Sequence, residues 1–336
     1  MNVKKIIWKT IVIVELLCII GLVTELIFPT LAIKVDVLHR SSLLFGNYGP
    51  IKYFYELKPH TTTTIHLLWK NTHGPNNPVY TINSDGLNQT SNNAIEKKKG
   101  VYRIAAIGDS FTFGRNVNTS QNYPSQLSDI LNKRYKCGNI AKFEVLNLGV
   151  SGYDLQYAEA RYEKRGKKYD PDLILWFLIG DDFRRLDEYQ IPIMRKYWNE
   201  IQKSNNYANY VAKGNYYPDF WKSETDMLRL FGAQNAIRFQ ESFLNQLRNT
   251  GKQPIVLFTF PDTEDIYKNL LTRFSRSTKS VYFYDRIPNI HAINNYILPD
   301  SHPSPKGYRA IAENLANYLV SRKIIDCTNS KFSKSH

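Results

Sequence analysis

The chain is poor in cysteine, and its potential metal ligands are not clustered. Three cysteines occur in 336 residues, an odd number, and they lie far apart with no Cys-x-x-Cys pair. A zinc finger and a disulfide-rich scaffold are therefore not expected; a single Cys137–Cys327 bridge stays open if the body of the protein lies in an oxidising compartment. The seven histidines are scattered, and none belongs to a His-Glu-x-x-His motif. We expect no metal and no other cofactor.

Acidic residues are fewer than basic ones. The 44 lysines and arginines exceed the 30 aspartates and glutamates, which gives a formal net charge of +14 and an isoelectric point near 9.4. Such an excess is found in proteins that bind nucleic acids or anionic membranes. The lysines are dispersed, however, and no nucleic-acid-binding module is recognisable. We therefore expect no nucleic-acid partner and interpret the charge as a solvated basic surface near anionic lipid or an acidic glycan.

Neither disorder nor an internal repeat is indicated. Hydrophobic residues make up 43% of the chain and aromatic residues 13%, which is ordinary for a folded protein and too apolar for a disordered one. At 336 residues the chain can form one large α/β domain with additions, or two domains of ~150 residues each.

One long hydrophobic run lies near the amino terminus. Residues 11–33 are largely apolar, and three lysines within the first nine residues precede them. A helix of about 23 residues, rising ~1.5 Å per residue, is long enough to cross a bilayer. Glu15 and Glu25 interrupt the run. Glu25 lies deeper, where an ionised carboxylate costs roughly a few kcal/mol, so we expect it to be protonated or paired.

This run is longer than the apolar core of a cleavable signal peptide, and it does not end in a small-x-small cleavage site. We interpret residues 1–34 as an uncleaved signal anchor with one transmembrane helix; a cleaved signal and a buried or interfacial helix are the alternatives. The basic amino end should stay in the cytoplasm, which places the rest of the chain outside. Lys34 and Arg40 follow the run and weaken this rule.

Residues 35–100 have the composition of a small β-rich segment and a linker. Thr, Val, Ile and Tyr are frequent in residues 61–69 and 79–83, and turn-forming Gly, Pro, Asn and Asp bound both stretches. We therefore expect short strands there, ahead of the main domain.

Residues 101–325 alternate between apolar, β-branched stretches and helical patterns. The expected strands are residues 101–107, 143–148, 173–179, 254–260 and 281–284, and the clearest helices are 123–135, 154–165, 233–248 and 305–322. This alternation predicts an α/β fold in which a mainly parallel five-stranded sheet is covered on both faces. The long aromatic and charged stretch at about 184–230 reads as an insertion, and residues 326–336 as a tail.

Unusual polar residues follow the first of these strands and precede the last helix. Gly-Asp-Ser ends at Ser110, and Asp300 and His302 flank one serine in the last loop. Ligands bind beyond the carboxyl ends of parallel strands. His302 can accept a proton near neutral pH, and Asp300 can hold its tautomer. The alternatives are that Asp109 or Ser110 only caps a helix and that His302 is an ordinary surface residue.

Glycines follow the second and third strands. They occur as Asn147-x-Gly149-x-x-Gly152 and as Gly180 before Asp181. A glycine at a strand end lets a backbone N–H approach a substrate oxyanion closely, although turn geometry alone explains each glycine as well.

Gly-Asp-Ser, Asn-x-Gly-x-x-Gly, Gly-x-Asp and Asp-x-His-Pro occur in this order, each at an expected strand end. The set resembles the SGNH (GDSL-like) hydrolase superfamily over about residues 101–322, which implies a three-layer, flavodoxin-like α/β/α sandwich. The resemblance implies that Ser110 is the nucleophile, that His302 and Asp300 are its base and acid, and that the Gly152 N–H binds the oxyanion. Residues 80–87 and the glutamate-bearing amino end extend the likeness to membrane-anchored bacterial members.

Two positions depart from the superfamily pattern. Its third block usually carries an asparagine whose amide donates to the oxyanion, and here that position is Asp181. An ionised carboxylate only accepts hydrogen bonds. Either burial keeps Asp181 protonated, or its side chain turns away, or the oxyanion hole is weaker, and one lost donor costs on the order of 2.7–4 kcal/mol. The Asp-x-His spacing, in place of Asp-x-x-His, resembles branches that include polysaccharide O-acetyltransferases.

These residues predict a serine esterase or acyl hydrolase that forms an acyl-enzyme, with acetylated glycans or lipids as its ester substrates. An O-acyltransferase that modifies a cell-surface glycan, and a non-catalytic, membrane-tethered glycan-binding or assembly protein, are the alternatives. Phe111 and Tyr153 line the acyl pocket or belong to the core, and His291 and Asp262 are structural or exposed. Four aromatic residues of the insertion stack on sugar rings or simply pack: Trp198, Tyr216, Tyr217 and Trp221.

Overall fold

The computed structural model describes residues 51, 54–67, 70–188 and 232–327. The expected membrane anchor at residues 1–34, most of the expected insertion with its four aromatic residues, and the tail from residue 328 lie outside the described residues. Within the described part of the chain, no helix is both long enough and apolar enough to cross a membrane.

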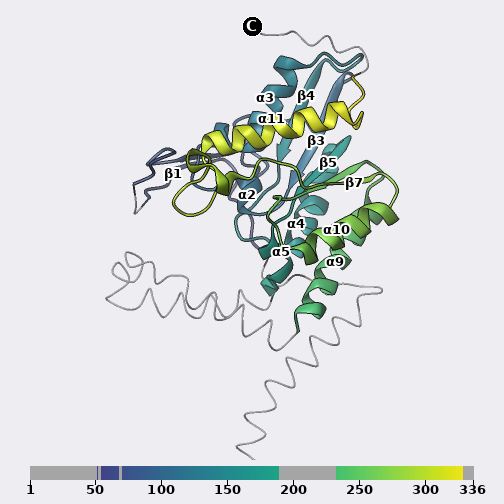
Figure 1. Cartoon of the computed structure of the whole chain (residues 1–336). Helices are drawn as coiled ribbons and strands as arrows, with labels where there is room; N and C mark the ends of the chain where they lie inside the picture. Colours follow the sequence, from purple (N-terminus) through teal and green to yellow (C-terminus); the bar gives the residue numbers. More distant parts are fainter. Residues whose placement is uncertain (1–50, 52–53, 68–69, 189–231, 328–336) are drawn as a thin grey trace, which may run out of the picture.

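A five-stranded parallel sheet forms the centre of the structure (Figure 1). Its strands, in spatial order, are β4 (Lys142–Asn147), β3 (Val101–Ile107), β5 (Leu173–Phe177), β6 (Ile255–Phe258) and β7 (Val281–Tyr284). All four neighbouring pairs are parallel. From β3 the chain moves outward to β4 and then returns to β5 on the other side of β3. The strand order therefore reverses beside β3, and ligands bind at such a reversal in parallel sheets.

Helices and short helical turns connect these strands or follow the last of them. They are α2 (Ser110–Phe113), η2 (Thr119–Gln121), α3 (Tyr123–Arg134), α4 (Leu155–Arg161), η3 (Tyr162–Gly166), η4 (Lys167–Tyr169), α5 (Gly180–Arg184), α9 (Ala233–Thr250), α10 (Asp265–Ser277), η5 (Ile290–Ala292), η6 (Asn294–Tyr296) and α11 (Pro305–Ser321).

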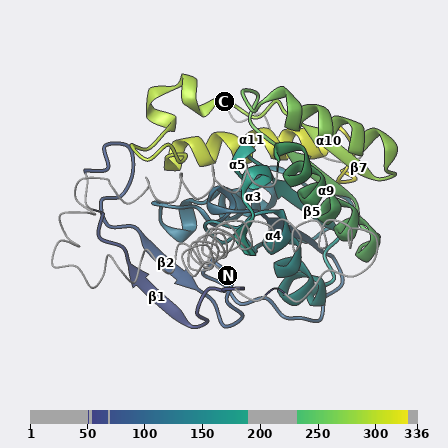
Figure 2. The same ribbon diagram turned by 90° about the horizontal axis from the view of Figure 1, so that it is seen from below.

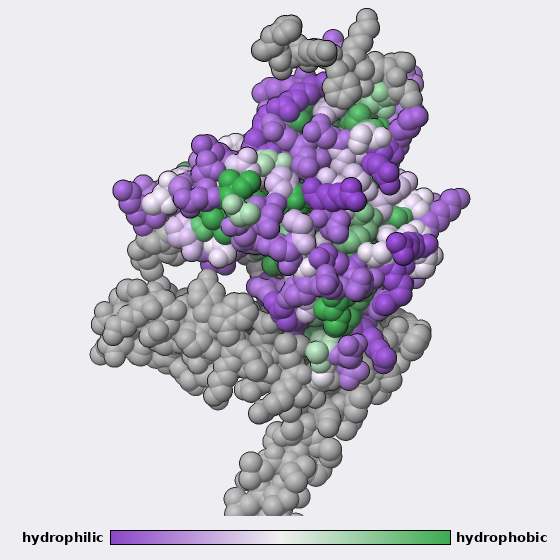
Figure 3. Space-filling model, in the orientation of Figure 1, coloured by the Kyte–Doolittle hydropathy of each residue, from purple (hydrophilic) through white to green (hydrophobic). Residues whose placement is uncertain are grey.

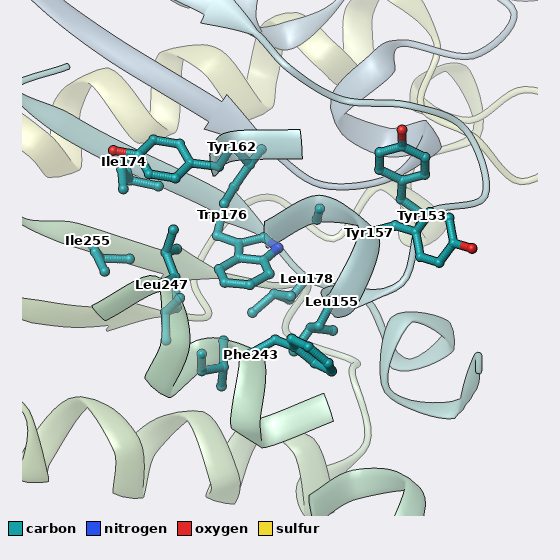
Figure 4. Close-up of a cluster of buried hydrophobic side chains, with 14 of the residues drawn as sticks. Tyr153, Leu155, Tyr157, Tyr162, Ile174, Trp176, Leu178, Phe243, Leu247 and Ile255 are labelled. Atoms are coloured by element: carbon teal, nitrogen blue, oxygen red, sulfur yellow. The ribbon is translucent and has the colours of Figure 1, made fainter. Parts of the chain in front are cut away.

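The sheet separates two hydrophobic layers, because alternate residues of a strand point to opposite faces. In β3, Ile104 and Ala106 join the layer that contains α3 and α11, whereas Ala105 and Ile107 join the layer that contains α4, α9 and α10. Figure 4 shows Trp176 of β5 inside the second layer, among side chains from α4 and α9. Helices thus cover both faces of the sheet.

The expected α/β fold with a mainly parallel five-stranded sheet is confirmed. Strands β3 and β7 have the predicted bounds, and β4 is shifted by one residue. Strand β5 ends earlier than predicted because Ile179 becomes the N-cap of α5. Helix α4 also ends early and continues into the wider π-helical turn η3. Helix α10 is an addition to the expected helices.

The segment before β3 packs against the sheet domain. Strands β1 (Thr61–Thr64) and β2 (Val79–Ile82) pair antiparallel and lie in the two stretches where short strands were expected. Figures 1 and 2 both show this pair on the side of the body opposite α9 and α10. Tyr80 and Ile82 of β2 form a small buried cluster with Phe113 of α2, so the segment contacts the loop that follows β3.

Glu56 fixes the beginning of this segment to the body. Its carboxylate pairs with Arg161, Lys164 and Arg165 at 2.5, 2.8 and 2.9 Å, and Arg161 is fully buried. Burial alone would raise the pKa of Glu56, but hydrogen bonds from Arg165 and Lys164 and the charge of Arg161 lower it to about 2. Residue 56 is therefore held against α4 and η3 by an ionised side chain.

Cys137 and Cys327 form a disulfide, the bridge that the sequence left open. Cys137 lies just beyond α3 and Cys327 lies beyond α11, so the bond joins the carboxyl-terminal ends of two helices on the same face of the sheet. Both cysteines are buried.

The face of the molecule seen in Figure 3 is mostly hydrophilic, and its hydrophobic patches are small and separate. The exposed large hydrophobic residues of the described chain come from different elements and loops: Ile65, Val79, Ile95, Ile266, Tyr282 and Ile293.

Candidate active site

Ser110 is the first residue of α2, directly beyond the carboxyl end of β3. Asp109 is the N-cap of that helix, and its Oδ1 accepts a hydrogen bond from the Phe111 N–H at 2.8 Å. Gly108 has a φ of 145°, and a Cβ there would lie 2.5 Å from Thr112 Oγ1, so only glycine fits this turn. The turn holds the Ser110 side chain at the strand order reversal, where it is 5% exposed.

The loop before α11 brings His302 and Asp300 to the same place. Ser301 between them has a φ of 69°, a left-handed turn that puts its two neighbours on one side. Two backbone bonds close the loop: the Leu298 N–H donates to the His302 carbonyl at 2.8 Å, and the Ser301 N–H to the Leu298 carbonyl at 3.0 Å. The N-cap Ser304 then starts α11, with Pro305 as its first residue.

Ser110, His302 and Asp300 form a continuous chain of hydrogen bonds. The Ser110 Oγ lies 2.8 Å from His302 Nε2, and His302 Nδ1 lies 2.9 Å from Asp300 Oδ2. The Ser110 and His302 positions are separated by 192 residues in sequence. The His302 and Asp300 side chains are only 12% and 15% exposed.

The Asp300 carboxylate is held ionised by its neighbours. Burial alone would raise its pKa, but the hydrogen bond and charge of His302 and the charge of Arg115 keep that pKa below its ordinary value. Arg115 Nε lies 3.9 Å from Asp300 Oδ2. An ionised Asp300 is the form that can accept a hydrogen bond from the imidazole.

The Asn147-to-Gly152 loop lies beyond β4 and packs under α2. Asn147 Oδ1 accepts from the Gly149 N–H at 3.0 Å, and a Cβ on Gly149 would lie 2.4 Å from the Phe113 nitrogen. Gly152 has a φ of 89°, which favours glycine. Within the described ranges, neither the Ser110 N–H nor the Gly152 N–H donates a hydrogen bond to another backbone group. Both N–H groups are therefore available to a substrate oxygen.

Asp181 lies in α5, and arginines surround its carboxylate. Its Oδ1 accepts a hydrogen bond from Arg184 Nη2, and its Oδ2 lies 3.9 Å from Arg185 Nη2. The side chain is 24% exposed. Among the described residues, no hydrogen bond or ion pair joins Asp181 to Ser110, His302 or Asp300.

The two aromatic residues of the expected acyl pocket have different surroundings. The Phe111 ring lies 4.8 Å from the His302 ring, centroid to centroid, and also packs on Phe177 and Phe260. The Phe111 ring therefore packs against the imidazole ring. Tyr153 is fully buried, and its hydroxyl donates to the Tyr55 carbonyl, so it belongs to the core.

The second histidine–aspartate pair is exposed. His291 Nδ1 lies 3.0 Å from Asp262 Oδ2, and both side chains are about two-fifths accessible to solvent. The Phe260 ring contacts both the His291 ring and the Phe111 ring, and Phe111 in turn contacts His302. The second pair is therefore separated from His302 by two aromatic side chains. It has no hydrogen bond to Ser110 among the described residues.

The sequence did not indicate that two carboxyl groups close to Ser110 in the chain or in α5 are buried with raised pKa values. Asp182 is buried, its Oδ2 accepts from the Ile179 N–H at 3.0 Å, and burial together with the charge of Asp109 raises its pKa well above the ordinary value. Burial likewise raises the pKa of Asp109, against the effect of Arg185. The adjacent acidic pair in the sequence was the only signal for this cluster.

Asn116 was also missed. Its side-chain Nδ2 donates a hydrogen bond to Asp300 Oδ2, the same oxygen that contacts His302. The sequence gives no signal for this contact, because the two residues are 184 positions apart and Asn116 belongs to no motif.

Residues 106–310 match the model of the GDSL-like Lipase/Acylhydrolase family. The solved structures similar to the chain include the psychrotrophic esterase EstA from Pseudoalteromonas sp., with 14% identity, a TM-score of 0.42, and coverage of 65% of this chain and 96% of that one. They also include a catalytic mutant of an acetylxylan esterase from Geobacillus stearothermophilus, with 17% identity, a TM-score of 0.42, and coverage of 72% of this chain and all of that one. No curated protein sequence matches the chain.

Proposed function

The chain belongs to the GDSL-like lipase/acylhydrolase family, a family of ester-bond hydrolases, and on this premise we propose that it is a serine esterase with Ser110, His302 and Asp300 as its catalytic triad. One observation supports the proposal most directly. The Ser110 Oγ is 2.8 Å from His302 Nε2, while His302 Nδ1 is 2.9 Å from an ionised carboxylate. This is the arrangement in which an imidazole activates an alcohol.

The reaction proceeds in two halves. Ser110 Oγ attacks the ester carbonyl carbon while its proton passes to His302 Nε2, and the leaving alcohol takes that proton as the C–O bond breaks. Water then attacks the acyl carbon while one of its protons passes to His302, and His302 returns that proton to Ser110 Oγ as the C–Oγ bond breaks and the carboxylic acid leaves. Asp300 keeps the Nδ1 proton in place and stabilises the imidazolium formed in each half.

The N–H groups of Ser110 and Gly152 are the proposed donors to the oxyanion. Neither N–H donates to another backbone group among the described residues, and Ser110 is the first residue of α2, where a backbone N–H has no carbonyl of the same helix to bond. Asp181 is paired with arginines and, as a carboxylate, contributes no donor. The proposed oxyanion hole therefore relies on backbone groups.

The proposed substrates are esters on O-acetylated glycans or on lipids, reached from outside the cytoplasm. Two features support this location. Residues 11–33 are apolar enough for an uncleaved anchor, and the Cys137–Cys327 disulfide is of a kind that persists in oxidising compartments and is rare in reducing ones. The catalytic domain is thus proposed to be extracytoplasmic, on a single-pass membrane anchor.

The proposal is tested on the purified full-length chain with p-nitrophenyl acetate as substrate. Ser110→Ala should abolish hydrolysis and also abolish covalent labelling by a fluorophosphonate probe. Ser275→Ala, in α10, removes a hydroxyl that donates to the Thr272 carbonyl away from the triad, and should retain both. Unchanged turnover in Ser110→Ala would refute the assignment. A wild-type chain that neither turns over the ester nor reacts with the probe would favour the non-catalytic alternative.

A transferase uses the same acyl-enzyme, and the short Asp300-to-His302 spacing is the feature that favours it. The two outcomes differ in the nucleophile that resolves the acyl group. If added glycan acceptors divert most of the acyl group from water, the enzyme is a transferase. If no acceptor competes with water, it is a hydrolase.

A further inference from the structure

The proposed triad acid has a second hydrogen-bond donor that no motif contains. Asn116 Nδ2 donates to Asp300 Oδ2, the oxygen that also lies 2.9 Å from His302 Nδ1. The other Asp300 oxygen, Oδ1, is 3.4 Å from the His302 backbone nitrogen. Asn116 thus shares one carboxylate oxygen with the imidazole and limits rotation of the carboxylate.

Asn116 adopts a backbone conformation that side chains rarely take. Its φ is 61°, in the left-handed region, and it is 5% exposed. A left-handed conformation costs roughly 1–2 kcal/mol for most residues, although asparagine tolerates it better than others. This conformation places the amide of a residue just beyond α2 against a loop that lies far away in the sequence.

Residues before β3 hold Asn116 in that conformation. The Asn116 N–H donates to the Tyr80 hydroxyl at 2.7 Å, and Asn71 Nδ2 donates to the Asn116 carbonyl at 3.4 Å. The Tyr80 ring is itself fixed edge-on against the Phe113 ring at 4.8 Å. Both backbone groups of Asn116 are therefore held by side chains from the segment that contains β2.

The same segment also contacts the histidine loop. A Cβ built on Gly74 would lie 3.1 Å from Leu298 Cδ2, and the Leu298 N–H donates to the His302 carbonyl. Asn71, Gly74 and Tyr80 all precede residue 106, where the family match begins. The groups that hold Asn116 and lie against the histidine loop thus come from outside the matched residues.

We propose that Asn116 is a positioning residue for Asp300, and that the segment carrying Asn71 and Tyr80 is a working part of the active site. This inference rests on the proposed function, because it assumes that Asp300 orients His302. The amide draws charge from Oδ2 and fixes the carboxylate plane, so the imidazole is oriented toward Ser110 without being over-stabilised as a cation.

The variant Asn116→Gly removes the amide and keeps the backbone, because glycine adopts a φ of 61° readily. Within the described part of the chain, the other charged or titratable groups that interact with the Asp300–His302 pair are Arg115, Asp109, Tyr80 and Tyr308, and this variant leaves them in place. We expect kcat per active site to fall about 10-fold with KM within about two-fold of wild type, as for other residues that orient a ligand or base.

The pH profile separates positioning from folding. Without the amide, Oδ2 carries more negative charge and holds the imidazolium more tightly, so the acid limb of kcat/KM should shift upward by about half a pH unit. Asn116→Asp places a second carboxylate beside Asp300 and should shift the limb further. Tyr80→Phe keeps the ring but leaves the Asn116 N–H unpaired, and kcat should fall about three-fold.

Tyr135→Phe is the matched control. Its hydroxyl donates to Asn317 Oδ1 at 2.6 Å beyond the last turn of α3, away from the triad. It should lose a similar hydrogen bond with no shift of the acid limb. Active sites are counted by fluorophosphonate titration and folding by the thermal unfolding midpoint.

Two results would overturn the inference. One is wild-type kcat and an unshifted acid limb in both Asn116 variants. The other is a loss confined to the fraction of active sites, with per-site kinetics and pH profile unchanged, which is what a purely structural residue gives. Failure of the proposed function is seen separately, as activity that survives in Ser110→Ala.

Discussion

At the scale of single residues, Asp181 is the departure with the clearest chemical consequence. The resemblance to related hydrolases leads to an asparagine at this position, and an amide could donate where a carboxylate cannot. In the structure, Arg184 and Arg185 form ion pairs with the Asp181 carboxylate. These ion pairs engage the carboxylate but supply no hydrogen-bond donor from this side chain.

Asp181→Asn should therefore raise activity. A restored amide donor at the oxyanion is worth a factor on the order of 100 in other enzymes, and we expect a gain of at least about 10-fold in kcat/KM for p-nitrophenyl acetate. The partly exposed ion pair with Arg184 that is lost contributes no more than about 1 kcal/mol to folding.

Asp181→Ala is the control for this substitution, since it removes the carboxylate without adding a donor. A gain in the alanine variant equal to that of the asparagine variant would mean that charge removal, and not the amide, is responsible. No gain in either variant would place Asp181 outside the oxyanion hole.

The site was predictable to the extent that it lies in short motifs. Ser110, Asp300 and His302 could be proposed from Gly-Asp-Ser and Asp-x-His-Pro, because each motif follows an expected strand or precedes a helix. Asn116 could not, because its contact depends on a left-handed φ and on a loop that only the tertiary fold brings near.

At the scale of elements, the interface between α4 and α9 contains a buried carboxyl group. Glu159 of α4 accepts a hydrogen bond from Gln246 of α9 at 2.9 Å through Oε2, while its Oε1 has no partner within the described part of the chain. Burial first, and the charge of Glu163 second, raise the pKa of Glu159 to about 8. The native protein therefore keeps this carboxyl protonated at neutral pH.

Folding stability should consequently decrease as the pH rises through this window. Between the ordinary glutamate pKa of 4.5 and about 8, the folded state holds a proton that the unfolded state releases, so each unit of pH favours unfolding. Glu159→Gln removes this dependence. We expect it to match wild type near pH 5 and to exceed it by about 1 kcal/mol or more near pH 8, measured by urea unfolding.

Glu96→Gln, at an exposed position before β3, is the control and should leave the pH dependence of the wild type unchanged. A Glu159→Gln variant that is less stable than wild type at both pH values would show that the carboxyl contributes through packing or hydrogen bonding instead.

The elements themselves were predicted unevenly. Strand β3 was predictable to the residue because Gly100 and Gly108 bound a run that is apolar and partly β-branched, with Arg103 as its one charged residue. Helix α10 was overlooked although Tyr267, Leu270 and Phe274 follow helical spacing, since polar residues outnumber them in the helix. A strand that is buried on both faces leaves a stronger pattern in the sequence than a helix with a single buried stripe.

At the scale of the whole molecule, the Cys137–Cys327 disulfide links positions 190 residues apart. A bridge over so long a loop restricts the unfolded chain strongly, and removing a native disulfide typically costs about 2–5 kcal/mol. The bond lies beyond the last turns of α3 and α11, whereas the proposed triad lies at the first residues of α2 and before α11.

Cys137→Ser should therefore lower the free energy of unfolding by about 2–5 kcal/mol while kcat at low temperature stays near that of wild type. Denaturant unfolding and p-nitrophenyl acetate turnover measure the two effects. Dithiothreitol should destabilise the wild type to the same extent and leave a Cys137→Ser/Cys327→Ser double variant unaffected. Equal stability of oxidised and reduced wild type would contradict this account.

The Glu56 ion pairs also limit how far the enzyme could work from a lipid surface. If residues 1–34 cross a membrane, only about 20 residues lie between the outer face of that membrane and Glu56, which pairs with Arg161 and Arg165. Even when fully extended, a segment of this length spans roughly 70 Å. Every ester that meets Ser110 would then lie within that length plus the extent of the sheet domain from the bilayer, a range that includes lipids and the polymers of the cell envelope.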